Sequence, residues 1–411
     1  MNRIIAVLFL AVCSVLHSQW IQLGSNTSAD LKSVFFINIS TGYVSGASGT
    51  MLKTTNGGLN WVSQVTGISE NINSVYFLTP QTGYACANNG KIIYTSTGGS
   101  SWLTAQSNVT DNLLSVSGNF CSGSEGTLLY TTNGGLNWVV ASGGFFSTNY
   151  YGINSLSASI AIACGVNAIF QPLVARTTNG GVNWSYSTFY LNSNEGNLRD
   201  VIFLNSNNVL CVSNVWDGTG GISRSVNSGV NWTTQIFPSA LNSIDMAGAF
   251  GFAAGHQGYV LKTIDSGLVW HQSQTGLNTI FRSADIIDEL NAYICGDGGV
   301  IIKTTNGGVT LVQSITSDIP VIFSLSQNYP NPFNPSTTIN FSIPSVETTR
   351  RVVSLKVYNI SGSEIATLVN QQLTPGTYSA TWDASNFPSG MYFYRLSSGG
   401  FTQTNKMVLI K

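Results

Sequence analysis

One eight-residue motif recurs along most of this chain and constrains its fold more than any other feature. The string TTNGGLNW occupies residues 54–61 and again 131–138, and TTNGGVNW occupies 177–184. Degenerate copies at 95–102, 225–232, 263–270 and 304–311 bring the total to seven. Their six intervals cover 250 residues, about 42 residues per repeat. Such a chain is expected to fold as an array of similar units.

The segments that precede each copy predict that the unit is all β. An alternating apolar strand comes first, as at 31–36, then a strand of small residues with glycine, as at 42–46, then a short strand, as at 50–53. With the strand after the motif, the unit has the size of a four-stranded propeller blade. Residues 20–23 read like a post-motif tryptophan and its strand. We therefore predict an all-β, seven-bladed propeller over residues 19–315, sealed by its N-terminal strand beside residues 300–314.

The repeated turn is specified by its own residues. In the first copy the Asn56 side chain can bond to the backbone two residues on, Gly57 and Gly58 permit positive φ, and Trp61 can pack between this hairpin and the next blade. The positions that we expect to be structural turn residues are Asn56, Gly58, Trp61, Gly99, Trp102, Asn133, Gly135, Trp138, Asn179, Gly181, Trp184, Asn227, Gly229, Trp232, Asp265, Gly267, Trp270, Asn306 and Gly308.

This pattern, Ser/Thr-x-Asp/Asn-x-Gly-x-x-Trp, resembles the Asp-box, or bacterial neuraminidase repeat. The longer unit resembles the photosystem II stability/assembly factor family of propellers, over roughly residues 20–315. The resemblance implies a β-propeller with structural Asp-box turns. It does not select a function, because Asp-box turns of that wider family occur in hydrolases, receptors and assembly factors alike.

The N-terminus carries the features of a targeting signal. Residues 1–18 combine a positive start, an apolar run and a small residue at the cleavage position, which predicts a secretory signal peptide. A lipoprotein reading, with Cys13 as the modified residue, stays open as an alternative. No later stretch approaches the roughly 20 apolar residues of a membrane helix, so no transmembrane segment is expected in the mature chain.

A composition break at about 315–325 separates the repeats from a different C-terminal segment. Residues 324–411 resemble the type A C-terminal sorting domain of the type IX secretion system. The match is carried by residues 358–362 and 388–392, by Lys411, and by the motif Asn328, Tyr329, Pro330, Asn331, Pro332, Phe333, Asn334 and Pro335. The resemblance implies export across both membranes of a Gram-negative-type cell, with the secretion machinery as partner and a secreted or surface-attached product.

For this segment we expect a linker at 316–325 and a small immunoglobulin-like β-sandwich over 326–411. The apolar patterns place strands at 352–358, 376–382, 391–396 and 403–410. The alternation of proline with asparagine near 328–335 predicts an extended, turn-rich entry that no central strand would tolerate.

Composition narrows the possible partners. The chain has 16 Lys+Arg against 17 Asp+Glu, a net charge of −1, which offers no basic field for nucleic acid. After the signal only His256 and His271 remain, too few for a histidine-based metal site, and we expect no metal and no cofactor. The five remaining cysteines are expected to be buried and reduced, because equivalent positions in different blades should lie too far apart to bond.

Two classes of function remain. Asp200, Asp245 and Asp285 lie near the first strands of their units, which should line the channel, so they are candidates for the carboxylate pair of an extracellular glycoside hydrolase. The same residues could instead cap strands by local hydrogen bonding. A sialidase is disfavoured because Arg176 and Arg224 hold repeat positions rather than forming an arginine cluster.

The favoured hypothesis is a secreted or cell-surface propeller that serves as a non-catalytic binding or adhesion module. Its ligand would be an extracellular polysaccharide or a protein, because polar amides and exposed aromatic planes suit both. Two longer insertions, at 195–197 and 216–221, are candidate binding loops.

Overall fold

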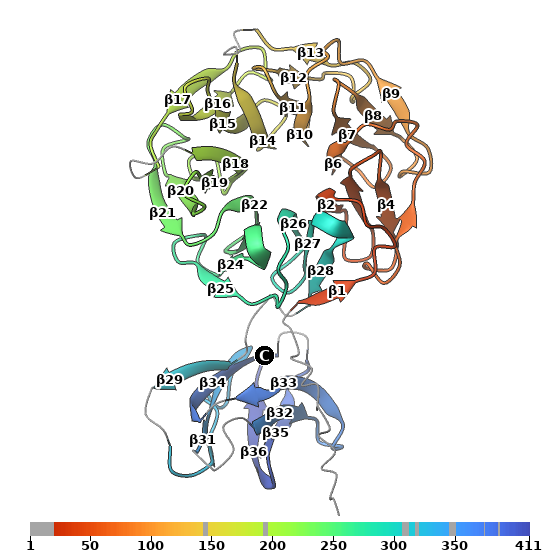
Figure 1. Ribbon diagram of the computed structural model, residues 1–411. Coiled ribbons are helices and arrows are strands. Elements are labelled where there is room, and N and C mark those ends of the chain that lie inside the picture. The colour runs from red at the N-terminus through yellow and green to blue at the C-terminus, as the bar shows by residue number, and fades with distance from the viewer. Residues whose placement is uncertain are drawn as a thin grey trace, which may run out of the picture. The chain divides into compact units, whose positions relative to one another are not determined.

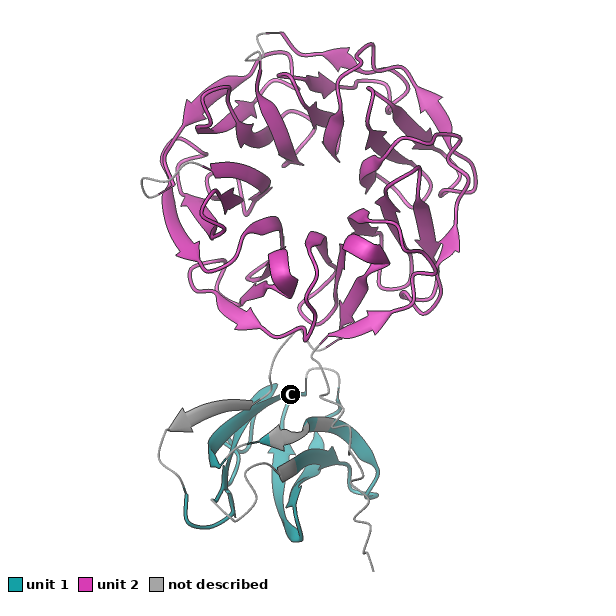
Figure 2. Ribbon diagram, in the orientation of Figure 1, with its two compact units in different colours: residues 1–18, 309–411 teal, residues 19–308 magenta. Residues whose placement is uncertain are grey.

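The computed structural model describes residues 20–142, 147–191, 196–305, 312–316, 320–344, 351–373, 375–384 and 387–411. These residues form β-strands and loops, with two short 3-10 turns at His256–Gly258 (η1) and Asp297–Gly299 (η2). The chain divides into two compact units, residues 19–308 and residues 309–411 (Figure 2). The predicted signal peptide with Cys13, and the seventh-motif residues Asn306 and Gly308, lie outside the described residues.

The first unit is a ring of seven four-stranded antiparallel sheets, which confirms the predicted seven-bladed propeller (Figure 1). Blade 1 contains β2 (Leu31–Phe36), β3 (Gly42–Gly46), β4 (Met51–Thr54) and β5 (Val62–Ser63). Blade 2 contains β6 (Ile72–Phe77), β7 (Gly83–Ala87), β8 (Ile92–Thr95) and β9 (Leu103–Ala105). Blade 3 contains β10 (Leu113–Ser117), β11 (Phe120–Gly123), β12 (Leu128–Tyr130) and β13 (Val139–Val140).

The later blades repeat this order from the ring axis outwards. Blade 4 contains β14 (Asn149–Ser155), β15 (Ala161–Val166), β16 (Pro172–Thr177) and β17 (Ser185–Thr188). Blade 5 contains β18 (Gly196–Phe203), β19 (Val209–Val215), β20 (Gly220–Ser225) and β21 (Thr233–Phe237). Blade 6 contains β22 (Leu241–Ala247), β23 (Phe250–Gly255), β24 (Val260–Thr263) and β25 (His271–Ser273). Blade 7 contains β26 (Phe281–Ile286), β27 (Ala292–Gly296), β28 (Ile301–Thr304) and, from the N-terminus, β1 (Ile21–Leu23).

The N-terminal strand closes the ring as the sequence predicts. β1 runs antiparallel to β28, with Ile21 opposite Lys303. Trp20 packs edge-on against Phe252 of blade 6, with ring centroids 5.0 Å apart, and its Nε1 donates a hydrogen bond of 3.0 Å to Ser273 Oγ. Closure by the chain's own first strand leaves blade 7 with the same four strands as the others.

Side-chain hydrogen bonds define the repeated turn, though not all in the way that the sequence suggests. Thr54 Oγ1 accepts a bond from the Gly58 N–H at 2.9 Å, and Asn56 Oδ1 accepts one from the Asn60 N–H at 3.0 Å. The asparagine therefore bonds to the backbone four residues on, not two, because the two glycines extend the turn. Gly57 and Gly58 have φ values of 66° and 85°, which glycine adopts without strain.

The closing tryptophans join each blade to the preceding one, not to the next one as the sequence analysis expected. Trp61 of blade 1 packs edge-on against Phe36 at 5.9 Å, and Phe36 stacks on Tyr293 of blade 7 at 3.7 Å. Trp138 of blade 3 likewise packs edge-on against Tyr84 of blade 2 at 5.7 Å. Blades 1 and 7 are therefore also joined by apolar packing, in addition to the pairing of β1 with β28.

The five cysteines are buried and free, and those of neighbouring blades stand at adjacent repeat positions, a case that the expectation for equivalent positions did not cover. Cys86 neighbours Cys121 across the interface of blades 2 and 3, and Cys164 neighbours Cys211 across that of blades 4 and 5, so that each neighbour adds to the rise that burial causes in the pKa of Cys121 and of Cys211. Cys86 pairs in register with Ser74 and Cys121 with Val116, adjacent repeat positions whose side chains leave a strand on opposite faces. Opposite faces of neighbouring blades meet, so the two thiols meet.

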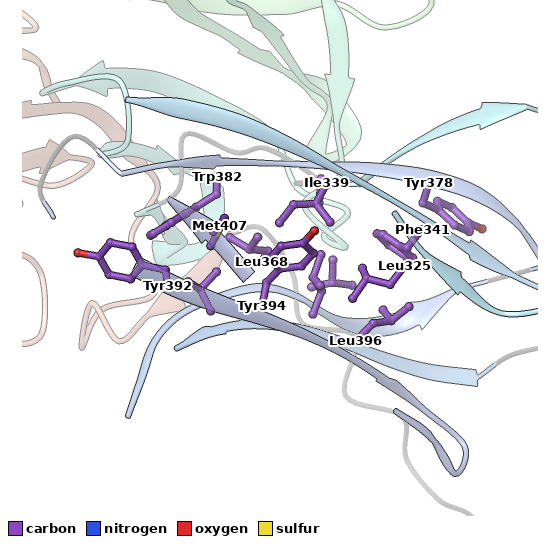
Figure 3. Packing of buried hydrophobic residues seen from close by; sticks show 14 of the residues in the cluster. Leu325, Ile339, Phe341, Leu368, Tyr378, Trp382, Tyr392, Tyr394, Leu396 and Met407 are labelled. Carbon is purple, nitrogen blue, oxygen red and sulfur yellow. The ribbon is translucent and has the colours of Figure 1, made fainter. Parts of the chain in front are cut away.

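The second unit is a small sandwich of two four-stranded sheets. One contains β29 (Val312–Thr316), β34 (Gly376–Asp383), β31 (Ser336–Ile343) and β30 (Ser324–Leu325), and the other contains β33 (Glu364–Leu373), β32 (Arg351–Tyr358), β35 (Gly390–Ser398) and β36 (Phe401–Leu409). Its core includes Ile339, Trp382, Tyr394 and Leu396, which point between the sheets (Figure 3). The sequence analysis missed β31 and β33 and assigned residues 312–315 to the propeller, whereas β29 pairs with β34.

The proline-rich motif is packed onto this sandwich. The Asn328 N–H donates to Tyr394 Oη at 2.9 Å, and its Nδ2 donates to Thr337 Oγ1 at 2.9 Å. Phe333 is buried against Trp382, with ring centroids 5.6 Å apart. The segment is therefore held by specific side chains of the domain that follows it.

Candidate functional site at the channel mouth

Every blade of the propeller has a β-bulge at the same place in its innermost strand. The register between first and second strands shifts around the second residue of the repeat in all seven sheets. Bulges re-aim a side chain and are frequent next to functional sites. The seven bulged residues, which we call the bulge ring, are Lys32, Asn73, Leu114, Tyr151, Arg199, Asn242 and Arg282.

The bulge ring lines a cavity of about 230 Å³, to which Asp30 and Asp297 also contribute. Because each blade supplies one side chain, the cavity lies around the ring axis at the end where the innermost strands begin. In an antiparallel meander the loops between second and third strands lie at that same end. We call this end the mouth of the channel.

The charged residues of the mouth are only partly paired with one another. Arg282 and Asp297 form a bidentate pair, with Nε to Oδ1 at 2.7 Å and Nη2 to Oδ2 at 2.8 Å. Asp30 Oδ1 accepts a bond from the Gly298 N–H at 2.9 Å. Arg199 lies 4.4 Å from the centre of the Tyr151 ring, and its buried Nε has no hydrogen-bond partner among the described residues.

The mouth holds three cations, Lys32, Arg199 and Arg282, and two carboxylates, Asp30 and Asp297, an excess of one positive charge. Burial lowers the pKa of Lys32 and Arg282 lowers it further, while Asp297 and Asp30 act in the opposite direction. Burial also lowers the pKa of Arg199. The pKa of His256, in the turn η1, is lowered first by burial and then by Arg282 and Arg199. The excess of one positive charge, rather than these burial effects, is what favours an anion at the mouth.

The residue after each bulge serves a different purpose. Its side chain accepts a hydrogen bond from the backbone N–H of the next blade's innermost strand, at 3.0–3.3 Å, in six of the seven blades. These acceptors, which we call the acceptor ring, are Ser33, Ser74, Ser115, Asp200, Ser243 and Ser283. The innermost strand of each blade has no strand on its inner edge, so these side chains provide acceptors for N–H groups at that edge. The resulting bonds connect the inner strands of neighbouring blades.

Blade 4 is the exception, and it explains why an aspartate stands in blade 5. Gly152 has no side chain to bond the Val201 N–H, and a Cβ there would lie 2.8 Å from the Asp200 Cα. Asp200 Oδ1 accepts the Val201 N–H at 2.9 Å, while its Oδ2 accepts the Ile244 N–H and Ser243 Oγ, each at 3.0 Å. The two oxygens of the Asp200 carboxyl therefore accept the two N–H groups that serines at positions 152 and 200 would otherwise accept.

The other two candidate carboxylates make similar bonds two residues further along. Asp245 Oδ2 accepts the Ile286 N–H at 2.6 Å, and Asp285 Oδ2 accepts the Phe36 N–H at 2.8 Å. Each bond joins one blade to the next. All three aspartates of the sequence hypothesis thus lie on the inner strands, and each accepts a hydrogen bond from the neighbouring blade.

Burial raises the pKa of all three carboxyls. It raises the pKa of Asp200 to about 6, against the lowering effect of its hydrogen bonds. It raises the pKa of Asp245 to about 7 and that of Asp285 well above its ordinary value, with Asp245 adding to the effect on Asp285. Raised carboxyl pKa values are a property of general acids, but buried structural carboxyls share it.

The other sequence candidates are placed as follows. Glu195 lies outside the described residues, whereas Trp216 stands in the loop between β19 and β20 and packs against Phe170 at 4.9 Å. His271 is exposed at the start of β25. Among the described residues, His, Cys, Asp and Glu side chains form no group of three or more that could hold a metal ion. Within the same residues no helix has the length and apolar character needed to cross a membrane.

Sequence reasoning missed the bulge ring. The third-position serines repeat between blades and drew attention to the aspartates among them, while the second position changes from blade to blade between Lys, Asn, Leu, Tyr and Arg. That variation within a constant repeat was the available signal. Its meaning depends on the bulge, which the sequence pattern does not reveal.

The C-terminal unit matches a known protein family. Residues 327–411 match the family model described as the secretion system C-terminal sorting domain. The chain ends in a sorting domain. The protein is therefore exported, either to the cell surface or into the medium. No curated protein matches the chain.

Solved structures resemble the propeller in fold. The chain is similar to YCF48 bound to D1 peptide, with 18% identity and a TM-score of 0.57, covering 71% of this chain and 99% of that one. It is also similar to YCF48 from Cyanidioschyzon merolae, with 14% identity and a TM-score of 0.55, over 69% and 98% of the two chains.

A third similar structure spans most of this chain. PorZ, described as an essential bacterial surface component of the type-IX secretion system of Porphyromonas gingivalis, has 12% identity and a TM-score of 0.52. The match covers 95% of this chain and 60% of PorZ. At these identities the three likenesses establish the fold alone.

Proposed function

We propose that this exported propeller is a non-catalytic binding module whose ligand enters the mouth of the channel. The observation that carries the proposal is the division of labour along the innermost strands. The acceptor-ring carboxylate Asp200, with Asp245 and Asp285, is engaged by backbone N–H groups of neighbouring blades. The bulge ring, one residue earlier, lines a cavity and leaves Arg199 Nε without a described partner.

Binding at such a place suits the scaffold. A rigid ring presents seven side chains to one ligand, and those of Lys32, Leu114 and Arg199 can change without loss of an interblade hydrogen bond among the described residues. YCF48, of similar fold, is described as bound to a D1 peptide. That likeness supports ligand binding by propellers of this kind, though the choice of ligand has to come from the residues of this chain.

Polysaccharide hydrolysis is the second candidate function. It is favoured by the raised pKa values of Asp200 and Asp245, about 6 and about 7, because a glycosidase needs one protonated carboxyl beside an ionised one. The hydrogen bonds that these carboxyls accept from the backbone are the reason to rank it second.

One experiment separates the two functions. The full mature chain is incubated with a panel of neutral and acidic polysaccharides, and both retention of the protein and release of reducing ends are recorded. We expect retention on at least one member with no release of reducing ends. Release that disappears in Asp245→Asn, a variant that keeps an amide acceptor for the Ile286 N–H, would replace the binding module with a hydrolase.

A further inference from the structure

We propose that the channel mouth binds a sugar residue that carries a carboxylate, such as a hexuronate, at the end of an acidic polysaccharide. The inference rests on the proposed binding function and specifies its ligand. Three features of the propeller support it: the charges of the mouth, the polar atoms of the mouth that make no bond with the described residues, and an aromatic patch on the same face.

The charge of the mouth matches one monoanion. The cavity is lined by three cations, Lys32, Arg199 and Arg282, and by two carboxylates, Asp30 and Asp297. The Arg282–Asp297 pair neutralises itself, and Asp30 is engaged by a backbone N–H. No hydrogen bond or ion pair within the described part of the chain engages Lys32. A carboxylate between Lys32 and Arg199 would give Arg199 Nε its missing acceptor.

The remaining lining suits the rest of a sugar ring. The Asn242 amide donates to the Phe281 carbonyl at 2.8 Å, and the Asn73 amide donates to the Leu113 carbonyl at 2.7 Å. These bonds fix both side chains and leave their amide oxygens as acceptors that nothing in the described residues uses. Hydroxyl groups are suitable donors to such oxygens, and Leu114 offers an apolar contact for the C–H groups of a pyranose ring.

An aromatic patch shows where the polysaccharide chain would continue. Phe170 and Trp216 pack at 4.9 Å from the loops between second and third strands of blades 4 and 5, so they lie at the mouth end of the propeller. Trp216 is 57% exposed and Phe170 is 50% exposed. Tyr190, also exposed, is held by a bond of 2.9 Å from Gln171 Nε2 to its hydroxyl.

The patch belongs to the same two blades that supply Arg199 and Tyr151 to the mouth. Aromatic planes of this kind stack on sugar rings, so the second and third residues of a bound chain would lie against blades 4 and 5.

The test measures binding of galacturonate, galactose and trigalacturonate to the full mature chain by calorimetry or ligand-observed NMR. We expect galacturonate to bind at least about tenfold more tightly than galactose, and added salt to weaken the binding. Lys32→Gln and Arg199→Gln should each weaken galacturonate binding about tenfold or more. Lys91→Gln, which removes a cation from the same face away from the cavity, should leave the affinity unchanged.

The aromatic patch has its own test within this experiment. Trp216→Ala should weaken trigalacturonate binding several-fold and leave monomeric galacturonate unaffected, because only the longer ligand reaches blades 4 and 5. Thermal unfolding of each variant identifies a folding defect. If Arg199→Gln is misfolded, Lys32→Gln carries the test alone.

Several results would overturn the inference. They are equal affinity for galactose and galacturonate, unchanged galacturonate affinity in the folded mouth variants, or no galacturonate binding at millimolar concentration. Binding of a tripeptide with a free carboxyl terminus, but not of galacturonate, would assign the mouth to a peptide end instead. Retention on neutral polysaccharides alone would contradict the acidic ligand and leave the binding module standing, whereas release of reducing ends would contradict the binding module itself.

Discussion

The bulge ring comes from the innermost strands of all seven blades and the acceptor ring from six of these strands, one residue further along, and the two rings differ in side-chain type and in contacts. Acceptor-ring side chains are short, mostly serine, and bond the next blade's backbone. Bulge-ring side chains are long and varied and line a cavity. The difference teaches that in this repeat one position bonds the next blade in six of the seven blades, whereas the adjacent position varies in side chain and bonds the next blade through Asn73 and Asn242. The β-bulge separates the two roles by turning consecutive side chains in different directions.

The largest expected effect is a loss of stability when an acceptor-ring side chain is removed. Asp200→Ala removes the acceptor of the Val201 and Ile244 N–H groups and of the Ser243 hydroxyl. We expect the free energy of unfolding of the propeller to fall by about 2–4 kcal/mol, because buried donors without partners cost about 1–3 kcal/mol each. Urea unfolding measures the change. Glu289→Ala, which removes a carboxylate from an exposed turn, is the control and should change stability little.

A smaller loss is expected at the repeated turn. Thr131→Val removes the hydroxyl that accepts the Gly135 N–H at 3.0 Å and donates to Asn133 Oδ1 at 3.1 Å. The free energy of unfolding should fall by about 1–2 kcal/mol, from loss of these bonds within a turn that carries no ligand contact. The same urea titration measures it, and unchanged ligand retention is the accompanying expectation. Loss of retention in a stable Thr131→Val protein would move the binding site to the turns.

The pH dependence of stability follows from the raised carboxyl pKa values. A carboxyl with a higher pKa in the folded state binds more protons there than in the unfolded chain, so stability decreases as pH rises. With a pKa of about 6 for Asp200 and about 7 for Asp245, the decrease should extend from about pH 4 to about pH 7. Urea midpoints at several pH values measure it. Asp245→Asn should flatten the slope between pH 5 and 7, whereas an unchanged slope would mean that this carboxyl titrates normally.

The smallest effects on stability are expected in the bulge ring. Lys32→Gln removes a cation that makes no hydrogen bond with the described residues, and burial already lowers its pKa. The free energy of unfolding should stay within about 0.5 kcal/mol of the unmodified protein. A loss as large as that of Asp200→Ala would erase the distinction between the two rings.

How much the sequence predicts differs between the scaffold and the site. The spacing of the tryptophans was sufficient to predict seven blades, because a period of about 42 residues is compatible with few β architectures. Trp20, which has no motif before it, was sufficient to predict that the N-terminal strand closes the ring. The direction in which Trp61 packs was not readable, since it depends on how neighbouring blades meet. The prolines near residues 330–335 concealed β31, whose alternating pattern begins directly after them.

The candidate site was harder to predict for a specific reason. Asp200, Asp245 and Asp285 were visible as unusual charges in a chain with few, and they stand on the first strands of their blades, β18, β22 and β26. Their hydrogen-bond partners come from other blades, which no local pattern specifies. Arg199 and Lys32 were likewise visible as residues, but only the register shift shows that they enter one cavity.

The central claim is tested most directly by two variants at adjacent positions. For Arg199→Gln and for Asp200→Ala, two quantities are measured: the urea midpoint of the propeller, and the affinity for galacturonate at pH 7 in the absence of urea. The account predicts that Asp200→Ala lowers stability by about 2–4 kcal/mol, while the fraction that stays folded binds galacturonate with unchanged affinity. Arg199→Gln should do the opposite, weakening binding about tenfold with stability changed by less than about 1 kcal/mol. Equal effects of the two substitutions on both quantities would contradict the separation of scaffold and site.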